Sequence, residues 1–553
     1  MFGLATLANA SWCLSGYQDW RRFRKHAEDP EATQQMILNR LITTNQETEF
    51  GKNFGFKRIK NYTDFKALVP LQGYEDFQTD ILRIARGEDQ VLTKGPVTLL
   101  EPSGGSSGGV KYIPYTQDLA QEFKRGIQAW IFDLFSSIPA LLNGPAYWSI
   151  SPANELPVIE GAQIPIGFND DSEYLSKFGQ GLMNHILAVP GFVSQIRDME
   201  AFRYVTLFYL LKAHDLRLIS IWNPTFLSLL LDELPKHWDA LLVDIKKGSI
   251  RELPGFPDAL LTQINRTLKA DGKRAKQLRG IGPGDLTLIW PKLRLISCWM
   301  DGTANHYAKR LEQDYFPGVE FQGKGLLATE AFVSFPLHDG FDPVLSIDSH
   351  FYEFLALDAS GVSLEEEPLP AHKLEQGQRY SVVVTTGGGL YRYRLNDIIE
   401  VTGFFQNTPR FRFRGKTEHY SDLFGEKLTE TFVADCLNET IAVMDLEPAF
   451  MLITPEENTP TPHYCLYFEH ESLAENVILD LASRVDLRLR KNYHYDYCRH
   501  LGQLGSLTVT HISRGSAIKY LEFRQQRGQK LGDIKPSLLD SSSGWGDLFK
   551  GAN

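Results

Sequence analysis

The sequence predicts an α/β protein, with a large N-terminal domain of layered sheets and helices and a smaller α+β domain at the C-terminus. The chain has 553 residues, too many for one compact core, so at least two domains are expected. From residue 286 short β-type runs alternate with helical segments, which is typical of a layered α/β domain. After about residue 415 the pattern becomes helix, two strands and helix. We therefore expect domains at 1–415 and 416–553.

The first half of the chain is expected to be mainly helical. Leu38, Leu41 and Ile42 follow helical spacing. Pro70, in "FKALVPLQGYEDF", predicts a turn that leads into another helix. The elements expected in order are helices within 1–50, strands at 97–101 and 110–116, a helix at 117–143, an irregular segment at 144–172 and helices within 195–275.

The second half is richer in β-type residues. Short runs are expected at 286–290, 293–299, 319–322 and 325–330, and longer strands at 350–357, 379–386, 390–401 and 410–415. In the smaller domain we expect a helix at 421–443, strands at 449–455 and 463–470, and a helix at 473–491.

Composition and charge argue against several classes of protein. The formal net charge of -11 offers nothing to neutralise a run of phosphates, so no general nucleic-acid binding is expected. The five cysteines form no CxxC pair, which favours a reducing cytosol over a disulfide framework or zinc site. No basic residue precedes the short apolar start, which is interpreted as a helix rather than a signal peptide. Asn223 and Pro224 interrupt the most apolar internal stretch, so no membrane insertion is expected. Together with the cysteine pattern, this predicts a cytoplasmic protein.

The stretch "EPSGGSSGGVKYIPY", residues 101–115, allows four interpretations. A flexible linker is disfavoured because the stretch lies between two short strands inside the first domain. A nucleophile elbow would need a helix directly after the serine, whereas a β-type run follows. A P-loop would need lysine where Val110 stands. The remaining interpretation is a strand–loop–strand hairpin whose backbone N–H groups, hydroxyls and Lys111 surround phosphates.

Several motifs in order resemble one enzyme family. "EPSGGSSGGVKYIP", "GKGLLATEAFVSFP", "SHFYEF", "GGGLYRYRLNDIIEVTGF" and "RFRFRGKTEHYSDLFGEK" are similar to the auxin-responsive Gretchen Hagen family of acyl acid amido synthetases, relatives of firefly luciferase and the acyl-CoA ligases. "EFGKNFGF", "IWNPTFL", "LISCWMDG" and "LGQLGSL" extend the resemblance over nearly the whole chain, which looks closer to the bacterial members. The resemblance implies an adenylate-forming N-terminal domain and a mobile C-terminal lid.

The resemblance assigns the phosphates of ATP to the Ser/Gly stretch. The implied binding residues carry hydroxyls, backbone N–H groups or a positive charge: Ser103, Ser106, Ser107, Gly108 and Lys111. The sequence departs from the family pattern at Gly104, where a serine is usual, so one side-chain donor is lost there.

The second and third motifs imply contacts to the rest of the nucleotide. Thr329 matches a hydroxyl that donates to the α-phosphate, and Glu330 matches a carboxylate ligand for Mg2+. Asp397 matches the acid that accepts hydrogen bonds from the ribose hydroxyls. Without the resemblance, Glu330 is interpreted as a surface charge in a turn, and Asp397 is interpreted as a residue that forms a turn.

The aromatic and lysine positions are matched in the same way. Phe351 and Tyr352 match the aromatic pair near the adenine, although a core role is equally natural for them. Lys427 and Lys535 match lysines of the small domain that approach the phosphates. Lys427 by itself is an ordinary exposed lysine.

Two clusters resemble metal sites but are discounted. His494, Asp496 and Cys498 would share one face of a strand, yet the matching family stretch is structural. The run "DSHFYEF" at 348–354 receives the same interpretation.

The implied reaction has two steps. The carboxylate of an acid attacks the α-phosphate of ATP and gives an acyl-adenylate and pyrophosphate, with Mg2+, Lys427 and loop N–H groups stabilising the leaving group. The small domain then rotates near Gly415 and Lys416, and the amine of an amino acid displaces AMP. An acyl-CoA ligase or another adenylate-forming transferase shares the first step, and a nucleotide-sensing relative without catalysis is the non-enzymatic alternative. The implied partners are therefore a small carboxylic acid and an amine.

Overall fold

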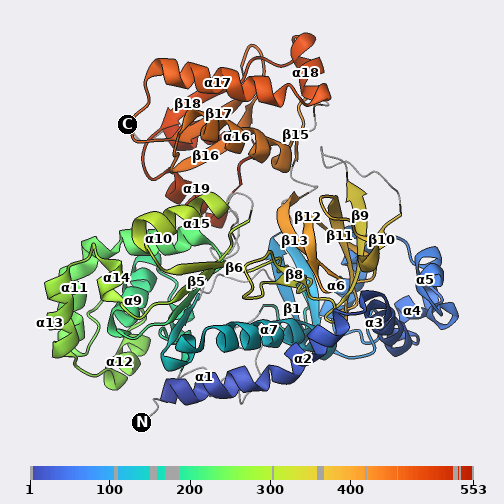
Figure 1. The fold of residues 1–553 in the computed structure, drawn as a ribbon, viewed down its shortest axis with the longest axis horizontal. Coiled ribbons are helices and arrows are strands. Elements are labelled where there is room, and N and C mark those ends of the chain that lie inside the picture. The colour runs from blue at the N-terminus through green and yellow to red at the C-terminus, as the bar shows by residue number, and fades with distance from the viewer. Residues whose placement is uncertain are drawn as a thin grey trace.

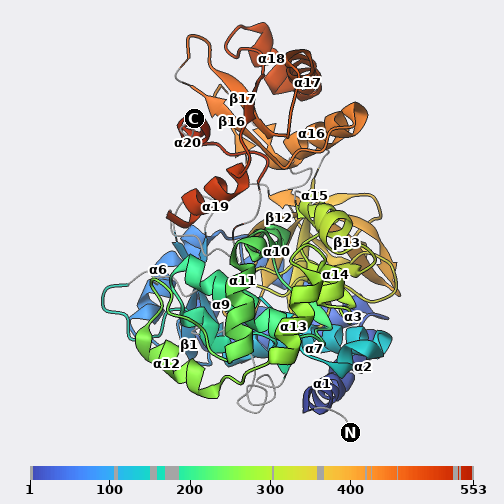
Figure 2. The ribbon, with the colours of Figure 1, turned by 90° about the vertical axis from the view of Figure 1, so that its left-hand side faces the viewer.

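The computed structural model describes residues 4–104, 110–149, 159–167, 186–301, 304–357, 367–416, 420–424, 426, 428–457, 459–526, 534, 537–542 and 544–550. Within these ranges the chain forms a seven-stranded sheet, a four-stranded sheet, a three-stranded sheet and two short ribbons. The first two sheets lie side by side above a long helix, and the C-terminal segment lies on the opposite side from the N-terminus (Figure 1, Figure 2).

The N-terminal region contains six helices among the described residues. Three of them start at side-chain caps, because Asp29, Thr48 and Asn61 each accept a backbone hydrogen bond from the first turn. Their bounds are α1 (Leu4–Ser15), α2 (Tyr17–His26), α3 (Pro30–Asn45), α4 (Glu49–Asn53), α5 (Tyr62–Leu68) and α6 (Tyr74–Ala85). The helical prediction for 1–50 and the turn at Pro70 are confirmed.

The Ser/Gly stretch belongs to an antiparallel hairpin. Strand β1 (Val97–Gly104) pairs with β2 (Val110–Thr116), and Ser103 lies opposite Lys111. Helix α7 (Gln117–Ser137) follows, capped by the Thr116 hydroxyl at the N–H of Leu119. The strand–loop–strand prediction is confirmed, whereas the linker and the nucleophile elbow do not fit a hairpin whose loop is followed by a strand.

The four-stranded sheet is parallel and is flanked by helices. Its order is β3 (Ala146–Trp148), β4 (Leu218–Ser220), β5 (Leu295–Cys298) and β6 (Glu320–Gly323). The surrounding helices are α9 (Met199–Lys212), α10 (Pro224–Asp232), α11 (Leu234–Lys247), α12 (Asp258–Thr267), α13 (Gly272–Ile281), α14 (Leu286–Ile289) and α15 (Ala304–Arg310).

One sequence prediction in this region is wrong, and two are incomplete. The helices expected within 195–275 are present as α9 to α12. The run 286–290 forms helix α14 rather than a strand, because the Asp285 side chain accepts from the N–H of Leu288 and starts a helical turn. The segments 144–172 and 195–275 each contribute one three-residue strand, β3 and β4, to the parallel sheet. Such short strands depend on their neighbours, so local pattern does not reveal them.

The seven-stranded sheet is antiparallel and has the order β10-β9-β11-β12-β13-β8-β7. The strands are β7 (Ser334–Phe335), β8 (Val344–Leu345), β9 (Phe351–Leu357), β10 (Leu369–Pro370), β11 (Arg379–Thr385), β12 (Tyr393–Phe405) and β13 (Thr408–Lys416). The four long strands match the predicted ones. The predicted run 325–330 is instead a turn, closed by an isolated bridge between Leu327 and Phe332.

The C-terminal segment is an α+β unit. Its elements are β14 (Tyr420–Ser421), β15 (Leu428–Thr429), α16 (Glu430–Met444), β16 (Phe450–Glu456), β17 (His463–Glu469), α17 (Glu475–Leu489), α18 (Tyr493–His500), β18 (Thr508–Ile512), α19 (Ser516–Gln526) and α20 (Trp545–Lys550). The predicted helix at 421–443 begins only at Glu430, where Thr429 caps it, since β14 and β15 form a ribbon before it. The strands at 449–455 and 463–470 are confirmed, and β18 adds a parallel third strand.

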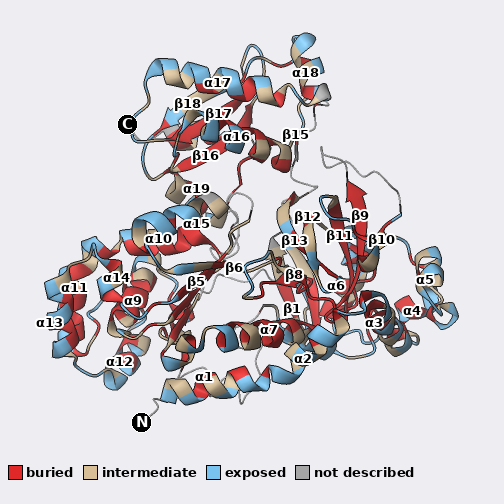
Figure 3. Ribbon diagram, in the orientation of Figure 1, coloured by how far each residue is buried: buried red, intermediate tan, exposed pale blue. Residues whose placement is uncertain are grey.

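Buried side chains form three apolar clusters. Figure 3 colours the buried residues of the ribbon red. The first joins the N-terminal helices to the seven-stranded sheet. The second surrounds the four-stranded sheet and includes Phe450, Tyr467 and Trp545 from the C-terminal segment. The third lies inside that segment. Apolar contacts therefore link the C-terminal segment to the parallel sheet, and the domain boundary at 415/416 stays a prediction.

Candidate active site

Glu330 lies where three parts of the N-terminal region meet. It follows β6 in the chain, only 9% of its surface is exposed, and the Tyr393 hydroxyl of β12 donates to its Oε1 at 3.4 Å. The preceding residue, Thr329, accepts a hydrogen bond at its carbonyl from the Tyr115 hydroxyl of β2 at 3.0 Å. Strands β2 and β12 therefore hold the Thr329–Glu330 turn from two sides.

Three charged groups act on the Glu330 carboxyl. Burial raises the pKa of the Glu330 carboxyl, the charges of Lys416 and Lys111 lower it, and the charge of Asp397 raises it further. Asp397 of β12, Lys111 of β2 and Lys416 of β13 are thus within electrostatic reach of Glu330. We call Lys111, Glu330, Asp397 and Lys416 the acid–lysine cluster.

Asp397 is the most deeply buried acid of the acid–lysine cluster. Only 2% of its surface is exposed, and it lies opposite Lys416 in the β12–β13 pair, with Nζ of Lys416 3.6 Å from its Oδ1. The preceding Asn396 has φ of 61°, a left-handed conformation that asparagine tolerates better than most residues. Oδ1 of Asp397 has no hydrogen-bond partner among the described residues. This oxygen is therefore able to accept hydrogen bonds from a ligand.

The hairpin end lies next to the acid–lysine cluster. Lys111 places its Nζ 5.7 Å from the centre of the Tyr74 ring, a cation–π contact, and the Tyr74 hydroxyl accepts from the N–H of Tyr112 at 2.8 Å. The charge of Glu330 raises the pKa of Tyr74, although burial is the larger cause. The start of β2 is therefore fastened to α6 and directed toward Glu330.

The predicted site residues divide into three groups. Lys111, Thr329, Glu330 and Asp397 come together, and Ser103 pairs with Lys111 across the hairpin. A second group lies outside the described residues: Ser106, Ser107, Gly108, Lys427 and Lys535. The third group is the aromatic pair Phe351 and Tyr352.

The aromatic pair packs in the core. The Tyr352 hydroxyl donates to the carbonyls of Phe332 and Ser346 at 2.9 and 3.2 Å. The Phe351 ring centre is 5.8 Å from those of Tyr62 and Phe65. These contacts favour the core interpretation, and the adenine role of both residues stays a prediction.

The discounted metal clusters receive no support. Residues 493–500 form helix α18, so the spacing of a strand does not apply, and Asp496 pairs with Arg490 and His500. Among the described residues no group of three or more His, Cys, Asp or Glu side chains could hold a metal ion.

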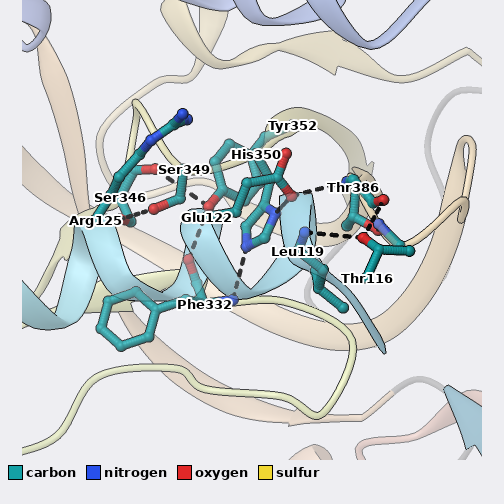
Figure 4. A network of polar contacts seen from close by, with 12 residues as sticks. Thr116, Leu119, Glu122, Arg125, Phe332, Ser346, Ser349, His350, Tyr352 and Thr386 are labelled. Atoms are coloured by element: carbon teal, nitrogen blue, oxygen red, sulfur yellow. Dashed lines mark hydrogen bonds and ion pairs between the residues drawn. The ribbon is translucent and has the colours of Figure 1, made fainter. Parts of the chain in front are cut away.

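A network of polar contacts around Glu122 and His350 reaches Phe332, which comes two residues after Glu330 (Figure 4). Glu122 of α7 is completely buried and binds Nδ1 of His350 at 2.8 Å, a guanidinium nitrogen of Arg40 at 2.7 Å and the N–H of Gly387 at 2.8 Å. Nε2 of His350 accepts from the N–H of Phe332 at 3.0 Å, so the proton of a neutral His350 sits on Nδ1 and is donated to Glu122.

The same network requires close packing of α7. A Cβ added at Gly126 would lie 2.2 Å from the Phe332 ring, so only glycine lets this ring approach the helix. Phe332 comes two residues after Glu330. Helix α7 and the start of β9 therefore fix the turn that carries Glu330.

Two further lysines were not predicted as binding residues. Lys416 was noted only as part of a hinge, because its proximity to Asp397 depends on the register of β12 and β13. Lys324, in the quoted motif "GKGLLATEAFVSFP", received no role, although its side chain is held among three tryptophans. No local sequence signal marks either contact.

In the part of the chain that the structure describes, no helix is both long enough and apolar enough to span a bilayer.

Comparison with known proteins gives one consistent family. Three family models match in order: the GH3 family N-terminal domain at 19–321, the GH3 family central domain at 343–416 and the GH3 family C-terminal domain at 434–543. The indole-3-acetic acid-amido synthetase GH3.17 of Arabidopsis thaliana is 25% identical over 570 residues, which covers 93% of this chain and 92% of the relative. A probable indole-3-acetic acid-amido synthetase GH3.4 of Oryza sativa subsp. japonica is 26% identical over 579 residues, with 96% and 89% covered.

Solved structures share the fold. The acyl acid amido synthetase AtGH3.15 in complex with 2,4-DB matches with a TM-score of 0.83 and 22% identity, covering 98% of this chain and 95% of that one. A 2-hydroxyisobutyryl-CoA ligase in the postadenylation state matches with a TM-score of 0.52 and 11% identity, covering 95% and 91%. The predicted fold class, a large α/β part with a smaller C-terminal α+β part, is confirmed. Since the N-terminal family model alone matches more than half of the sequence, the chain belongs to the GH3 family.

Proposed function

We propose that this chain is an acyl acid-amido synthetase, a ligase that activates a small carboxylic acid with ATP and transfers the acyl group to an amine, in particular that of an amino acid. The observation that carries the proposal is the acid–lysine cluster at the end of the β1–β2 hairpin. Membership of a family whose named relatives are amido synthetases supports it.

The hairpin and its lysine supply the phosphate site in this proposal. Lys111 provides a positive charge beside the loop that joins β1 and β2. The loop residues Ser106, Ser107 and Gly108, which lie outside the described residues, are proposed to add hydroxyl and N–H donors, as Ser103 would from β1. Charge that develops on the leaving pyrophosphate would be stabilised by these donors.

Asp397 is proposed to bind the ribose. Its Oδ1 is buried and lacks a hydrogen-bond partner among the described residues, so a pair of hydroxyl donors would satisfy it. Lys416, 3.6 Å away, would balance its charge without occupying the oxygen at hydrogen-bond distance.

Glu330 and Thr329 are proposed to act at the α-phosphate. The Glu330 carboxylate is a hard oxygen ligand. Burial raises its pKa because it disfavours the charged form, and a bound cation would stabilise that charged form. Both features fit Mg2+, with Glu330 as the residue that would hold it. When bound, Mg2+ would supply charge neutralisation at the phosphates. Thr329 would donate its hydroxyl to the α-phosphate.

The second step needs access for the amine. We propose that residues 416–553 act as a mobile lid that turns about Gly415 and Lys416, and that Lys427 and Lys535 approach the phosphates during activation. A Cβ at Gly415 would lie 2.5 Å from Oγ1 of Thr431 in α16, so a larger residue there would disturb the contact between the two parts. We also propose a cytoplasmic location.

Pyrophosphate exchange tests the first step. Purified protein is incubated with ATP, Mg2+, labelled pyrophosphate and a panel of aryl, indole and fatty acids; exchange that depends on one class of acid is expected. Mass spectrometry of the products with amino acids or CoA then identifies the acceptor. An amide product supports the proposal, whereas a thioester would replace it by acyl-CoA ligation. No exchange with any acid would overturn acid activation.

A matched pair of variants tests the ribose assignment. Asp397→Ala is expected to lower exchange by about 10²-fold or more, because two hydrogen bonds to a charged acceptor are lost. Asp480→Ala, on the exposed face of α17, serves as the control and should leave exchange unchanged. Retained exchange in a folded Asp397→Ala protein would contradict the assignment.

A further inference from the structure

Lys324 lies at the carboxyl end of the parallel sheet, inside a cage of tryptophans. Its Nζ is 4.9 Å from the ring centre of Trp222, 5.3 Å from that of Trp130 and 5.9 Å from that of Trp148. The same nitrogen donates to Oγ of Ser220 at 2.7 Å. We call Lys324 and these three tryptophans the tryptophan cage.

The strand register explains how the tryptophan cage forms. In the parallel pairs Trp148 lies beside Ser220, Ser220 beside Ser297, and Ser297 beside Gln322, so these four side chains share one face of the sheet. Lys324 comes two residues after Gln322, and Trp222 comes two residues after Ser220. Because side chains alternate between the two faces along a strand, Lys324 and Trp222 lie on that same face. Trp130 of α7 covers it and donates to Oε1 of Gln322 at 3.2 Å.

The charge of Lys324 has no acidic partner among the described residues. No ion pair to a carboxylate is formed there; the neighbouring titratable group is the buried thiol of Cys298. Burial lowers the pKa of Lys324 to about 7, while the indole faces favour the ammonium form. A half-buried cation without a counter-charge is a costly arrangement unless a ligand completes it.

Two more polar groups on this face are unpaired. Oγ of the fully buried Ser297 has no hydrogen-bond partner in the described part of the chain, and neither has Nε1 of Trp148. A hydroxyl, an indole N–H and an ammonium are all able to donate. The face therefore offers aromatic surface together with an excess of donors, which matches a flat ligand that carries an oxygen acceptor.

The position relates the tryptophan cage to the proposed active site. Ligands of parallel α/β sheets bind beyond the carboxyl ends of the strands, where Lys324 lies. Glu330 comes six positions after Lys324 in the chain, so the two Cα atoms are at most about 22 Å apart. An aromatic acid whose carboxylate lies near the Glu330 turn could extend toward the tryptophan cage.

We propose that the tryptophan cage binds the acyl group of the acid substrate and that Lys324 selects aromatic acids bearing an oxygen acceptor remote from the reacting carboxylate. Acceptors of this kind are a second carboxylate, a phenolate and a ketone, all of which accept a hydrogen bond from an ammonium. This inference rests on the proposed function and adds the class of acid.

Kinetics with paired acids test the selection. Lys324→Met keeps the length of the side chain and removes its charge. We expect kcat/KM in pyrophosphate exchange to fall roughly 10- to 100-fold for aryl acids with a remote oxygen acceptor. For the matching acids without that acceptor it should stay within about 2-fold, and KM for ATP should not change. The control Lys309→Met, on the exposed end of α15, should change neither series.

Equal losses for both series of acids, or no loss for either, would overturn the selection. Tryptophan fluorescence titrated with the acid alone separates this inference from the proposed function, since it needs no ATP. Quenching by acceptor-bearing acids that disappears in Lys324→Met supports the tryptophan cage even if no exchange occurs. Exchange without any difference between the two proteins in acid binding would leave the proposed function standing and reject the role of Lys324.

Discussion

The Glu122 network and the acid–lysine cluster are both buried and charged, but they differ in how far their groups are paired. Glu122 has three partners, from α3, the 387–389 loop and His350, each within 2.8 Å. Asp397 has one oxygen without a hydrogen bond in the described chain, and its ion pair to Lys416 is 3.6 Å long. A paired network stabilises a fold, whereas an unpaired one gains its partners from a ligand.

Chain position does not separate the two clusters. Phe332, which the Glu122 network holds through His350, is two residues from Glu330. The turn is therefore fixed on one side by satisfied groups and presents unsatisfied groups on the other. The comparison predicts that substitutions in the network mainly lower stability and that substitutions in the acid–lysine cluster mainly lower activity.

The largest effect is expected from Glu122→Ala. It leaves the Arg40 guanidinium, the His350 Nδ1–H and the N–H of Gly387 without their acceptor. Removing one partner of a buried ion pair costs about 3–5 kcal/mol in the free energy of unfolding. Urea unfolding followed by far-UV circular dichroism measures this. A loss below about 1 kcal/mol would show that the network is not structural.

Glu330→Gln should lower activity without lowering stability, the opposite of Glu122→Ala. The pKa of Glu330 is raised, so any stability that the group contributes is present at acid pH and lost as pH rises through that pKa. At neutral pH the glutamine variant should therefore unfold at an equal or higher urea concentration than the wild type. Pyrophosphate exchange should nevertheless fall about 10²- to 10³-fold, because the glutamine lacks the negative charge with which Glu330 is proposed to hold Mg2+ at the phosphates.

The two measurements together decide the comparison. A Glu330→Gln protein that loses stability as Glu122→Ala does would show that both clusters serve the fold. An unchanged exchange rate would remove Glu330 from the site.

His350→Phe tests the link between the two clusters. The change leaves the N–H of Phe332 without an acceptor and takes one donor from Glu122. We expect a loss of about 1–3 kcal/mol in unfolding free energy. Exchange, measured where the variant is fully folded, should fall by less than 10-fold because no group that contacts a ligand is removed. An activity loss as large as that of Glu330→Gln would place His350 in the site itself.

The sequence predicted the parts of the fold in which local pattern and environment agree. The long strands β9, β11, β12 and β13 alternate or are continuously apolar and were found in place. Helix α14 was missed because the Asp285 cap outweighs the β-type residues after it. Strand β4, with three residues, exists only through pairing with β3 and β5.

The site shows the same division. Glu330 and Asp397 were predicted from motif position, and the fold brings their charges together. Lys416 joins them through the register of two strands, and the surroundings of Lys324 come from α7, β3 and the end of β4. Contacts between distant segments of this kind have no local signal in a single sequence.

Lys324→Met is expected to change how the stability of the protein depends on pH. Because the folded-state pKa of Lys324 is lowered to about 7, the unfolded chain binds more protons between that pKa and about 10.4. Wild-type stability should therefore rise across this window, and the rise should be absent in Lys324→Met. The difference in urea midpoint between the two proteins should be largest near pH 6 and smallest above pH 10. A difference in urea midpoint that is the same at all pH values would mean that the pKa of Lys324 is not lowered. The indole faces of the tryptophan cage would then stabilise the ammonium as well as water does, and the arrangement would not require a ligand.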